Sequence, residues 1–209
     1  IALDSYTSSG HDGILDSSGR IDNDKTIEQL AKMAVSFASN GCDIVAPSDM
    51  MDGRVKKIRD ALEKERKLNT CILSYSAKFC SNFYSPFREA LGSKENIGKS
   101  SKSTYQINFK NKFEALKESV EDIFEGADIV MVKPAGYYLD IVSELRKICS
   151  IPIAAYQVSG EYSMIKFASE KKILNYKDCV LESLNCIKRS GADLIFSYFS
   201  KEVAEWINK

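Results

Sequence analysis

The chain has 209 residues, of which 44% are hydrophobic and 28% are charged, a composition typical of a globular domain with one sizeable core. Its 29 basic and 29 acidic residues balance to a net charge of zero, which argues against nucleic acid or a membrane surface as a partner. The apolar runs are far shorter than the roughly 20 residues that a membrane-spanning helix needs.

Strand-like and helix-like segments alternate along the chain. We expect strands at 1–4, 43–47, 71–75, 128–132, 151–156 and 193–197, with helices between them and a last helix at 201–207. A glycine followed by a short apolar run occurs three times, at Gly41, Gly126 and Gly191, each time after a helix-like segment (24–40, 111–125 and 176–190). Glycine just past a helix supplies a left-handed cap, so this repeat indicates βα units and a parallel sheet.

The number of units favours one architecture. Six βα units in a single domain (1–209) fit an α/β TIM (β/α)8 barrel that lacks about two N-terminal units. The rival is a doubly wound open sheet, which normally carries a G-x-G-x-x-G loop after a strand, and the sequence contains none.

Residues 79–108 interrupt this rhythm, because their only helical piece is short (85–91). A long loop directly after a strand is usually functional. We therefore expect 79–108 to form an active-site lid.

Two lysines, Lys78 and Lys133, follow buried strand-like runs. In a barrel, reactive groups gather at the carboxyl ends of the strands, so these amines should lie close together. Burial and mutual repulsion would lower the pKa of at least one of them, and a neutral amine attacks carbonyls to form imines. The alternative for either lysine alone is a buried stem with its head in solvent, or a phosphate contact.

Five motifs, in order and in register, resemble the 5-aminolevulinate dehydratase (porphobilinogen synthase) family over essentially the whole chain. They are Ala2-Leu-Asp-Ser-Tyr-Thr-Ser-Ser-Gly-His-Asp-Gly13, Pro47-Ser-Asp-Met-Met-Asp-Gly-Arg54, Tyr75-Ser-Ala-Lys78, Met131-Val-Lys-Pro134 and Val158-Ser-Gly-Glu-Tyr162. The resemblance implies a TIM barrel with an N-terminal arm, assembled as a homo-octamer. It also implies a hydro-lyase that condenses two 5-aminolevulinate molecules, with loss of two waters, to porphobilinogen for haem and chlorophyll biosynthesis. Since the family's arm and first strands would precede Ile1, we expect these 209 residues alone to fold poorly and to lack activity.

The resemblance also assigns roles to residues. Lys133 matches the lysine that forms the Schiff base with the first substrate, and Lys78 matches the second lysine. The first substrate's carboxylate would be held by Ser159 and Tyr198, and the second substrate's carboxylate by Arg88, Lys102 and Gln106 in the lid. Lysine stands at position 102, where arginine is common in the family. Lysine keeps the positive charge, but it cannot bind a carboxylate through two parallel hydrogen bonds as the arginine guanidinium does. Without the resemblance, a loop lysine of this kind is usually a solvated charge.

Metal use is implied by substitutions. Zinc-dependent members of the family carry cysteines where this chain has Ala2, Asp4 and Asp12, so the chain resembles the aspartate-type branch that uses no zinc. Asp4 and Asp12 either hold a hard metal ion or act through charge and hydrogen bonds, and both alternatives stay open. Glu118 matches the family's allosteric Mg²⁺ ligand, although by itself it is an ordinary helix-face glutamate. No organic cofactor is implied.

Other functions compete with this one. Another Schiff-base barrel, such as an aldolase, would need one imine lysine rather than two, and an inactive oligomer subunit would not need Lys78, Lys133, Ser159 and Tyr198 intact. The excess of lysine over arginine is typical of an AT-rich genome. We therefore expect a cytoplasmic bacterial protein, with a plastid as the alternative compartment.

Overall fold

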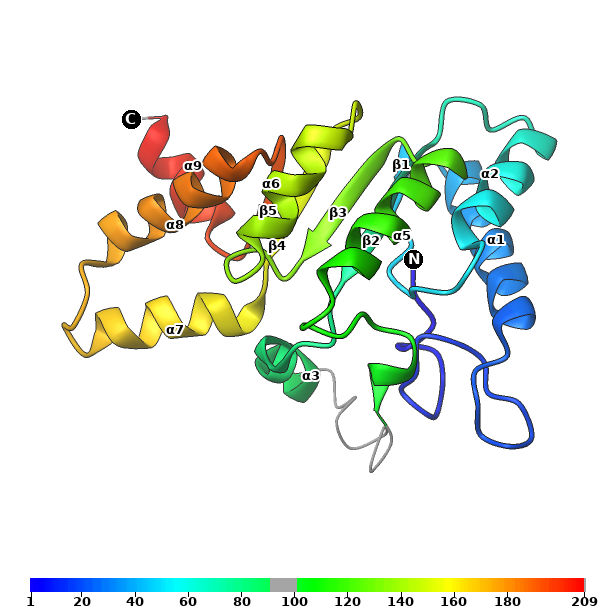
Figure 1. Cartoon of the computed structure of the whole chain (residues 1–209), viewed down its shortest axis with the longest axis horizontal. Coiled ribbons are helices and arrows are strands. Elements are labelled where there is room, and N and C mark those ends of the chain that lie inside the picture. Colours follow the sequence, from blue (N-terminus) through cyan, green and yellow to red (C-terminus); the bar gives the residue numbers. More distant parts are fainter. Residues whose placement is uncertain (91–100, 209) are drawn as a thin grey trace.

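A single parallel sheet forms the centre of the computed structural model, which describes residues 1–90 and 101–208. Its strands stand in chain order (Figure 1): β1 (Ile44–Val45), β2 (Cys71–Lys78), β3 (Ile129–Lys133), β4 (Ile153–Gln157) and β5 (Leu194–Ser197). All four neighbouring pairs are parallel. A doubly wound sheet needs a point where the strand order reverses, and this order has none, so the barrel prediction is confirmed over its rival.

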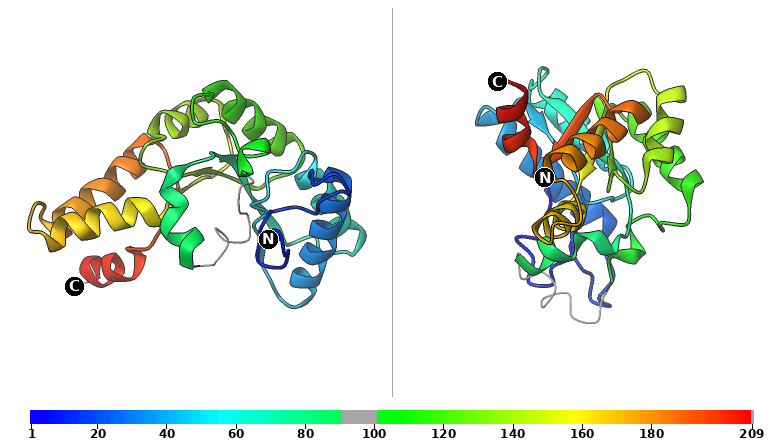
Figure 2. Two further views of the ribbon diagram at one scale, coloured as in Figure 1. Left: turned by 90° about the horizontal axis from the view of Figure 1, so that it is seen from below. Right: turned by 90° about the vertical axis from the view of Figure 1, so that its left-hand side faces the viewer.

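Helices cover the outer side of this sheet. Figure 2 shows them in an arc around the strands, while the short helix α3 and the N-terminal segment lie on the inner side. The helices are α1 (Asn23–Ser39), α2 (Arg54–Lys64), α3 (Ser85–Ala90), α5 (Lys112–Phe124), α6 (Leu139–Ile148), α7 (Ser159–Glu170), α8 (Tyr176–Ser190) and α9 (Ser200–Ile207), with 3-10 turns η1 (Asn82–Tyr84) and η2 (Lys102–Thr104). The shape is that of part of a barrel wall.

The strands bury residues on both faces, as expected for a parallel sheet under helices. Val130 and Val132 of β3 join the large cluster beneath the outer helices, whereas Met131 between them joins a small cluster on the inner face. Successive strand residues point to opposite faces, so this division follows from the pleat. The inner face is where a barrel encloses its site.

Glycines at the helix ends behave as predicted. Gly41, Gly126 and Gly191 have φ angles of 93°, 103° and 119°, values that only glycine adopts freely. Each one turns the chain from a helix into the following strand, so the predicted repeat is confirmed.

The strand expected at the N-terminus is wrong. Residues 1–4 form no strand: the Ile1 amine donates to the Ala46 carbonyl at 2.5 Å and Ser48 N–H donates to the Ile1 carbonyl at 3.0 Å, but the chain then turns, with Tyr6 N–H donating to Leu3. A pairing one residue wide does not make a strand. The helix α1 that follows is capped by Asp22, whose carboxylate accepts from Lys25 N–H at 3.1 Å.

Candidate active site

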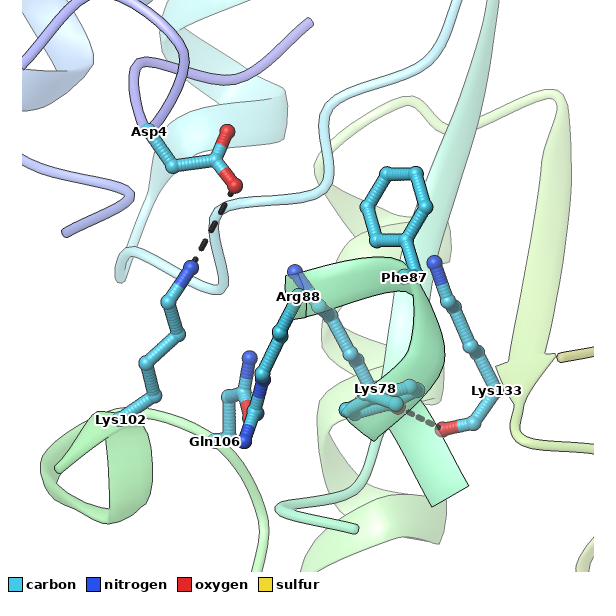
Figure 3. A pocket seen from close by; sticks show the side chains of 8 residues that line it. Asp4, Lys78, Phe87, Arg88, Lys102, Gln106 and Lys133 are labelled. Carbon is cyan, nitrogen blue, oxygen red and sulfur yellow. Dashed lines mark hydrogen bonds and ion pairs between the residues drawn. The ribbon is translucent and has the colours of Figure 1, made fainter. Parts of the chain in front are cut away.

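The two lysines lie directly opposite each other. Lys78 ends β2, Lys133 ends β3, and the two are partners in the parallel register. Adjacent strands are about 4.8 Å apart, and Figure 3 shows both side chains extending in the same direction from these strands. The two lysines therefore stand side by side at the carboxyl ends of neighbouring strands.

Aromatic rings surround the amine of Lys133. Its Nζ lies 4.3 Å from the ring centroid of Tyr156, 5.2 Å from that of Tyr75 and 5.5 Å from that of Tyr84. Burial, with a smaller contribution from the charge of Lys78, lowers the pKa of Lys133 to about 7. The sequence predicted a lowered pKa for at least one lysine from burial and mutual repulsion, and burial is the larger of the two causes. A substantial fraction of Lys133 is consequently neutral and nucleophilic near pH 7.

Lys78 has polar partners instead. Its side chain is 9% exposed, its ammonium donates to the Ser48 carbonyl, and it lies 3.6 Å from Oδ2 of Asp12. The carboxylate offsets the cost of burying the ammonium. The two lysines thus occupy different environments at the same end of the sheet.

A hollow in front of the lysines contains the residues that the resemblance assigned to the second substrate. Figure 3 shows its lining, which consists of Asp4, Lys78, Tyr84, Phe87, Arg88, Lys102, Gln106 and Lys133. Arg88 reaches it from α3, with its guanidinium carbon 5.2 Å from the centroid of the Tyr84 ring. Arg88, Lys102 and Gln106 are therefore brought together with both lysines.

A second hollow lies on the other side of Lys133. It is lined by Tyr84, Phe87, Lys133, Tyr156, Val158, Ser159 and Tyr198. Ser159 Oγ accepts a hydrogen bond from Phe87 N–H at 3.2 Å, which ties it to α3. Because the two hollows share Lys133, Tyr84 and Phe87, they are neighbouring compartments of one site.

Lys102 forms ion pairs with the two aspartates of the N-terminal segment. Its Nζ lies 3.0 Å from Oδ1 of Asp12 and 3.4 Å from Oδ2 of Asp4. Burial opposes ionisation of Asp12, but the ammonium groups of Lys78 and Lys102 hold its pKa below the usual value. With an ammonium between them, the two carboxylates do not offer a metal ion a free set of ligands. Within residues 1–90 and 101–208, no group of three or more His, Cys, Asp or Glu side chains could hold a metal ion.

Glu118 lies apart from both hollows, on α5. It is half-buried, and burial together with the charges of Glu121 and Asp122 raises its pKa. Its assignment as an allosteric Mg²⁺ ligand stays a prediction.

The predicted lid segment is fastened at both ends to the end of β2. Phe79 and Ile107 form a parallel bridge, Ile107 N–H donates to the Lys78 carbonyl at 3.0 Å, and Cys80 N–H donates to Ile107 at 2.8 Å. The helical piece expected at 85–91 is α3 (Ser85–Ala90). Residues 91–100 of the expected lid lie outside the described residues.

Sequence reasoning missed the ring of tyrosines around Lys133. Tyr75 and Tyr156 lie on β2 and β4, the strands on either side of β3, and both pack against the inner-face cluster. The register of the strands would have placed them beside Lys133, but a register cannot be read from a single strand-like run.

A parallel α/β half-barrel with its polar side chains gathered at the carboxyl ends of the strands defines the chain as part of a TIM-barrel protein. The family model described as delta-aminolevulinic acid dehydratase matches residues 1–206. The chain belongs to the delta-aminolevulinic acid dehydratase family, and the resemblance noted in the sequence is confirmed.

Individual relatives agree with the family match. The chain is 54% identical over 204 residues to delta-aminolevulinic acid dehydratase 1, chloroplastic, of Arabidopsis thaliana, covering 98% of this chain and 47% of the relative. It is 54% identical over 200 residues to the Escherichia coli (strain K12) delta-aminolevulinic acid dehydratase, covering 96% of this chain and 60% of the relative. The chain thus spans about half the length of the curated relatives that it matches.

A solved structure shares the fold. The porphobilinogen synthase of Toxoplasma gondii ME49, in complex with the reaction product porphobilinogen, superposes with a TM-score of 0.96 at 49% identity. The match covers 99% of this chain and 58% of that chain, which agrees with part of a barrel.

Proposed function

We propose that the protein to which this chain belongs is a porphobilinogen synthase, a hydro-lyase that condenses two 5-aminolevulinate molecules to porphobilinogen with loss of two waters. The observation that carries the proposal is the pairing of Lys78 with Lys133 at the carboxyl ends of β2 and β3, with the pKa of Lys133 lowered to about 7. A one-lysine aldolase would not need the second amine.

Lys133 would form the first imine. Its neutral amine attacks the keto carbon of one substrate, and loss of the carbonyl oxygen as water gives the Schiff base. Ser159 and Tyr198 line the same hollow as Lys133 and would donate hydrogen bonds to that substrate's carboxylate. Holding the carboxylate and the keto carbon at fixed points orients the substrate for the second bond-forming step.

Lys78 would engage the second substrate in the adjoining hollow. Arg88 and Gln106 line that hollow and would bind the second carboxylate. Lys102 supplies further positive charge there, although its ammonium is shared with Asp4 and Asp12. The amino group of the first substrate then condenses with the keto carbon of the second, whose oxygen leaves as the second water. The carbon next to that keto carbon loses a proton and bonds to the imine carbon of the first substrate, and the amine of Lys133 is expelled as the ring becomes aromatic.

Metal and assembly belong to the same proposal. We infer an allosteric Mg²⁺ at Glu118, which would hold the ion through a carboxylate oxygen, no zinc at the Asp4 and Asp12 positions, and a homo-octamer. The carboxylates there are hard ligands, and Lys102 already pairs with them. Equilibrium dialysis of Mg²⁺ against the full gene product and against Glu118→Gln, with mass photometry of both, tests the ion and the assembly.

We also infer the compartment in which the protein works. Relatives named as chloroplastic and the Escherichia coli relative reach the same identity, so cytoplasm remains our inference and a plastid the alternative. The described residues contain no helix long and apolar enough to cross a membrane. Fluorescence microscopy of the tagged full gene product in its source cell distinguishes the two compartments.

The decisive experiment is imine trapping. The full gene product is incubated with 5-aminolevulinate, reduced with borohydride, digested and mapped by mass spectrometry, while porphobilinogen is measured in a parallel sample. We expect substrate mass on Lys133, with or without Lys78, and loss of porphobilinogen formation in Lys133→Ala. Folded protein without an adduct on either lysine would overturn the proposal, and an adduct without porphobilinogen would favour an aldolase.

A further inference from the structure

Glu161 is a buried carboxylate that the proposed chemistry leaves without a role. It lies in the first turn of α7 and is 4% exposed. Its Oε1 accepts from Gly136 N–H at 2.6 Å, and its Oε2 accepts from Val158 N–H at 2.7 Å. Burying a carboxylate is costly unless it is hydrogen-bonded, and charge-assisted bonds to backbone N–H groups are among the strong ones. One side chain thus joins the loop after β3 to the loop after β4.

Each of these loops carries a group of the candidate site. Gly136 stands three residues after Lys133, and Val158 immediately precedes Ser159. Lys133 and Ser159 line the same hollow. The carboxylate of Glu161 therefore connects the backbone supporting the imine lysine to the backbone supporting the hydroxyl.

Close packing leaves little freedom at this junction. A Cβ on Gly136 would lie 2.6 Å from Oε1 of Glu161, and a Cβ on Gly160 would lie 2.5 Å from the Phe83 carbonyl oxygen. Phe83 belongs to η1, at the start of the segment expected to form the lid. At Gly160 only glycine allows the approach without movement of the backbone, whereas at Gly136 an added Cβ would displace the carboxylate of Glu161. The first turn of α7 is thus locked against the Lys133 loop and against η1.

We propose that Glu161 is a positioning residue that sets the distance between the Lys133 amine and the Ser159 hydroxyl, so that a keto acid held by its carboxylate presents its carbonyl to the amine. This role rests on the proposed function. Through it, Glu161 would make the hollow select a keto acid over a ketone that has no carboxylate. The distance between the carboxylate and the keto carbon of the substrate must match the distance between Ser159 and the Lys133 amine. A small mismatch between the two distances lowers the rate of imine formation steeply.

Levulinate and 2-pentanone form a matched pair of probes, because they share a carbon chain and a ketone while only levulinate has the carboxylate. In the full gene product, we would compare the rates of borohydride trapping of each probe on Lys133 by peptide mass spectrometry. In Glu161→Gln, one acceptor becomes an amide that faces a backbone N–H, so the bridge is broken with little change in volume. We expect the ratio of levulinate to 2-pentanone trapping to fall about tenfold, since 2-pentanone does not use Ser159.

Glu170→Gln is the matched control, because Glu170 is an exposed residue at the other end of the same helix. Its ratio should equal that of the wild type. Equal loss of both probes in Glu161→Gln would mean a merely structural role and would overturn the proposal, as would an unchanged ratio.

A second variant covers the case in which Glu161→Gln does not fold by circular dichroism. Gly136→Ala places a methyl against Oε1 from the opposite side and should produce the same selective loss; an unchanged ratio in this variant would overturn the proposal. Wild-type protein that traps neither probe on Lys133 would instead reject the proposed function, and the positioning role with it.

Discussion

Two opposing effects determine the pKa of Lys133. Removal from water disfavours its ammonium form, whereas the faces of Tyr75, Tyr84 and Tyr156 favour a cation. Because the pKa is lowered to about 7, removal from water is the stronger influence. The rings exclude water more than they stabilise charge, which suits an amine that must react as the free base.

This balance predicts the pH dependence of Lys133. The neutral fraction should rise about tenfold per pH unit below the pKa of about 7 and level off above it, since only the free amine is nucleophilic. Trace labelling with acetic anhydride across pH 5 to about 11, mapped to each lysine by mass spectrometry, measures this midpoint without any substrate. A midpoint near 10.4, the value of a model lysine peptide, would contradict the prediction.

Tyr84 connects the segment after β2 to the backbone of Lys133. Its buried hydroxyl donates to the Lys133 carbonyl at 3.0 Å, a carbonyl that also accepts from Phe79 N–H at 2.9 Å. Tyr84→Phe keeps the ring and loses one bond, so we expect the free energy of unfolding to fall by about 1 kcal/mol. Urea denaturation measures it, with Tyr137→Phe as control because that ring is 61% exposed. Equal losses in the two variants would show that the bond contributes nothing.

At the scale of elements, a buried ion pair joins α2, α5 and β2. Arg54 of α2 lies 3.2 Å from Oδ2 of Asp122 on α5, and Ser74 of β2 donates to the same oxygen at 2.7 Å. The side chain of Arg54 is buried among these partners, which makes it a structural ion-pair residue and not a site for a free anion. Removing one partner of a buried pair leaves an uncompensated charge, which is costly.

We therefore expect Asp122→Ala to lower the free energy of unfolding of the full gene product by about 3–5 kcal/mol. Glu121→Ala, one residue earlier on the same helix, should cost less than about 1 kcal/mol, because its pair with Lys117 is exposed to solvent. Guanidinium chloride denaturation compares the two variants. Similar costs for both would show that the buried pair does not join these elements.

Elements with a local signal were predictable from the sequence. The predicted helix 176–190 coincides with α8 (Tyr176–Ser190), because Asn175 caps its start and Gly191 ends it. The strand expected at 71–75 continues to Lys78, since polar Ser74 and Ser76 are buried by tertiary contacts that a hydrophobic pattern does not register. The strand expected at 1–4 failed because an apolar run does not show whether a neighbour pairs with it along its length.

At the scale of the whole molecule, the lysines could be predicted because strand ends converge in any barrel. The ion pairs of Lys102 with Asp4 and Asp12 could not be, because they join segments about 90 residues apart in the chain. The same limit applies to Glu161, whose partners Gly136 and Val158 come from two different loops. Polar contacts between distant segments can be known only from the completed fold. The convergence of strand ends, by contrast, follows from the fold class alone.

The open sheet exposes apolar side chains at its β5 edge. Leu194 and Phe196 are 42% and 40% exposed, and Phe196 pairs with Tyr156 of β4, so these side chains lie on the inner face. Exposed strand edges with apolar side chains promote association between chains. These 209 residues prepared alone should therefore self-associate as their concentration rises, which size-exclusion chromatography with light scattering measures.

Leu194→Lys should reduce that association, because a charge at a strand edge opposes edge-to-edge pairing. Ile173→Lys is the control, since Ile173 is 74% exposed but lies outside the sheet, between α7 and α8. If both substitutions act equally, general surface hydrophobicity rather than the β5 edge drives the association. A preparation that stays monomeric at every concentration would mean that the inner face of this half-barrel tolerates solvent, and the expected dependence on the rest of a barrel would then be wrong.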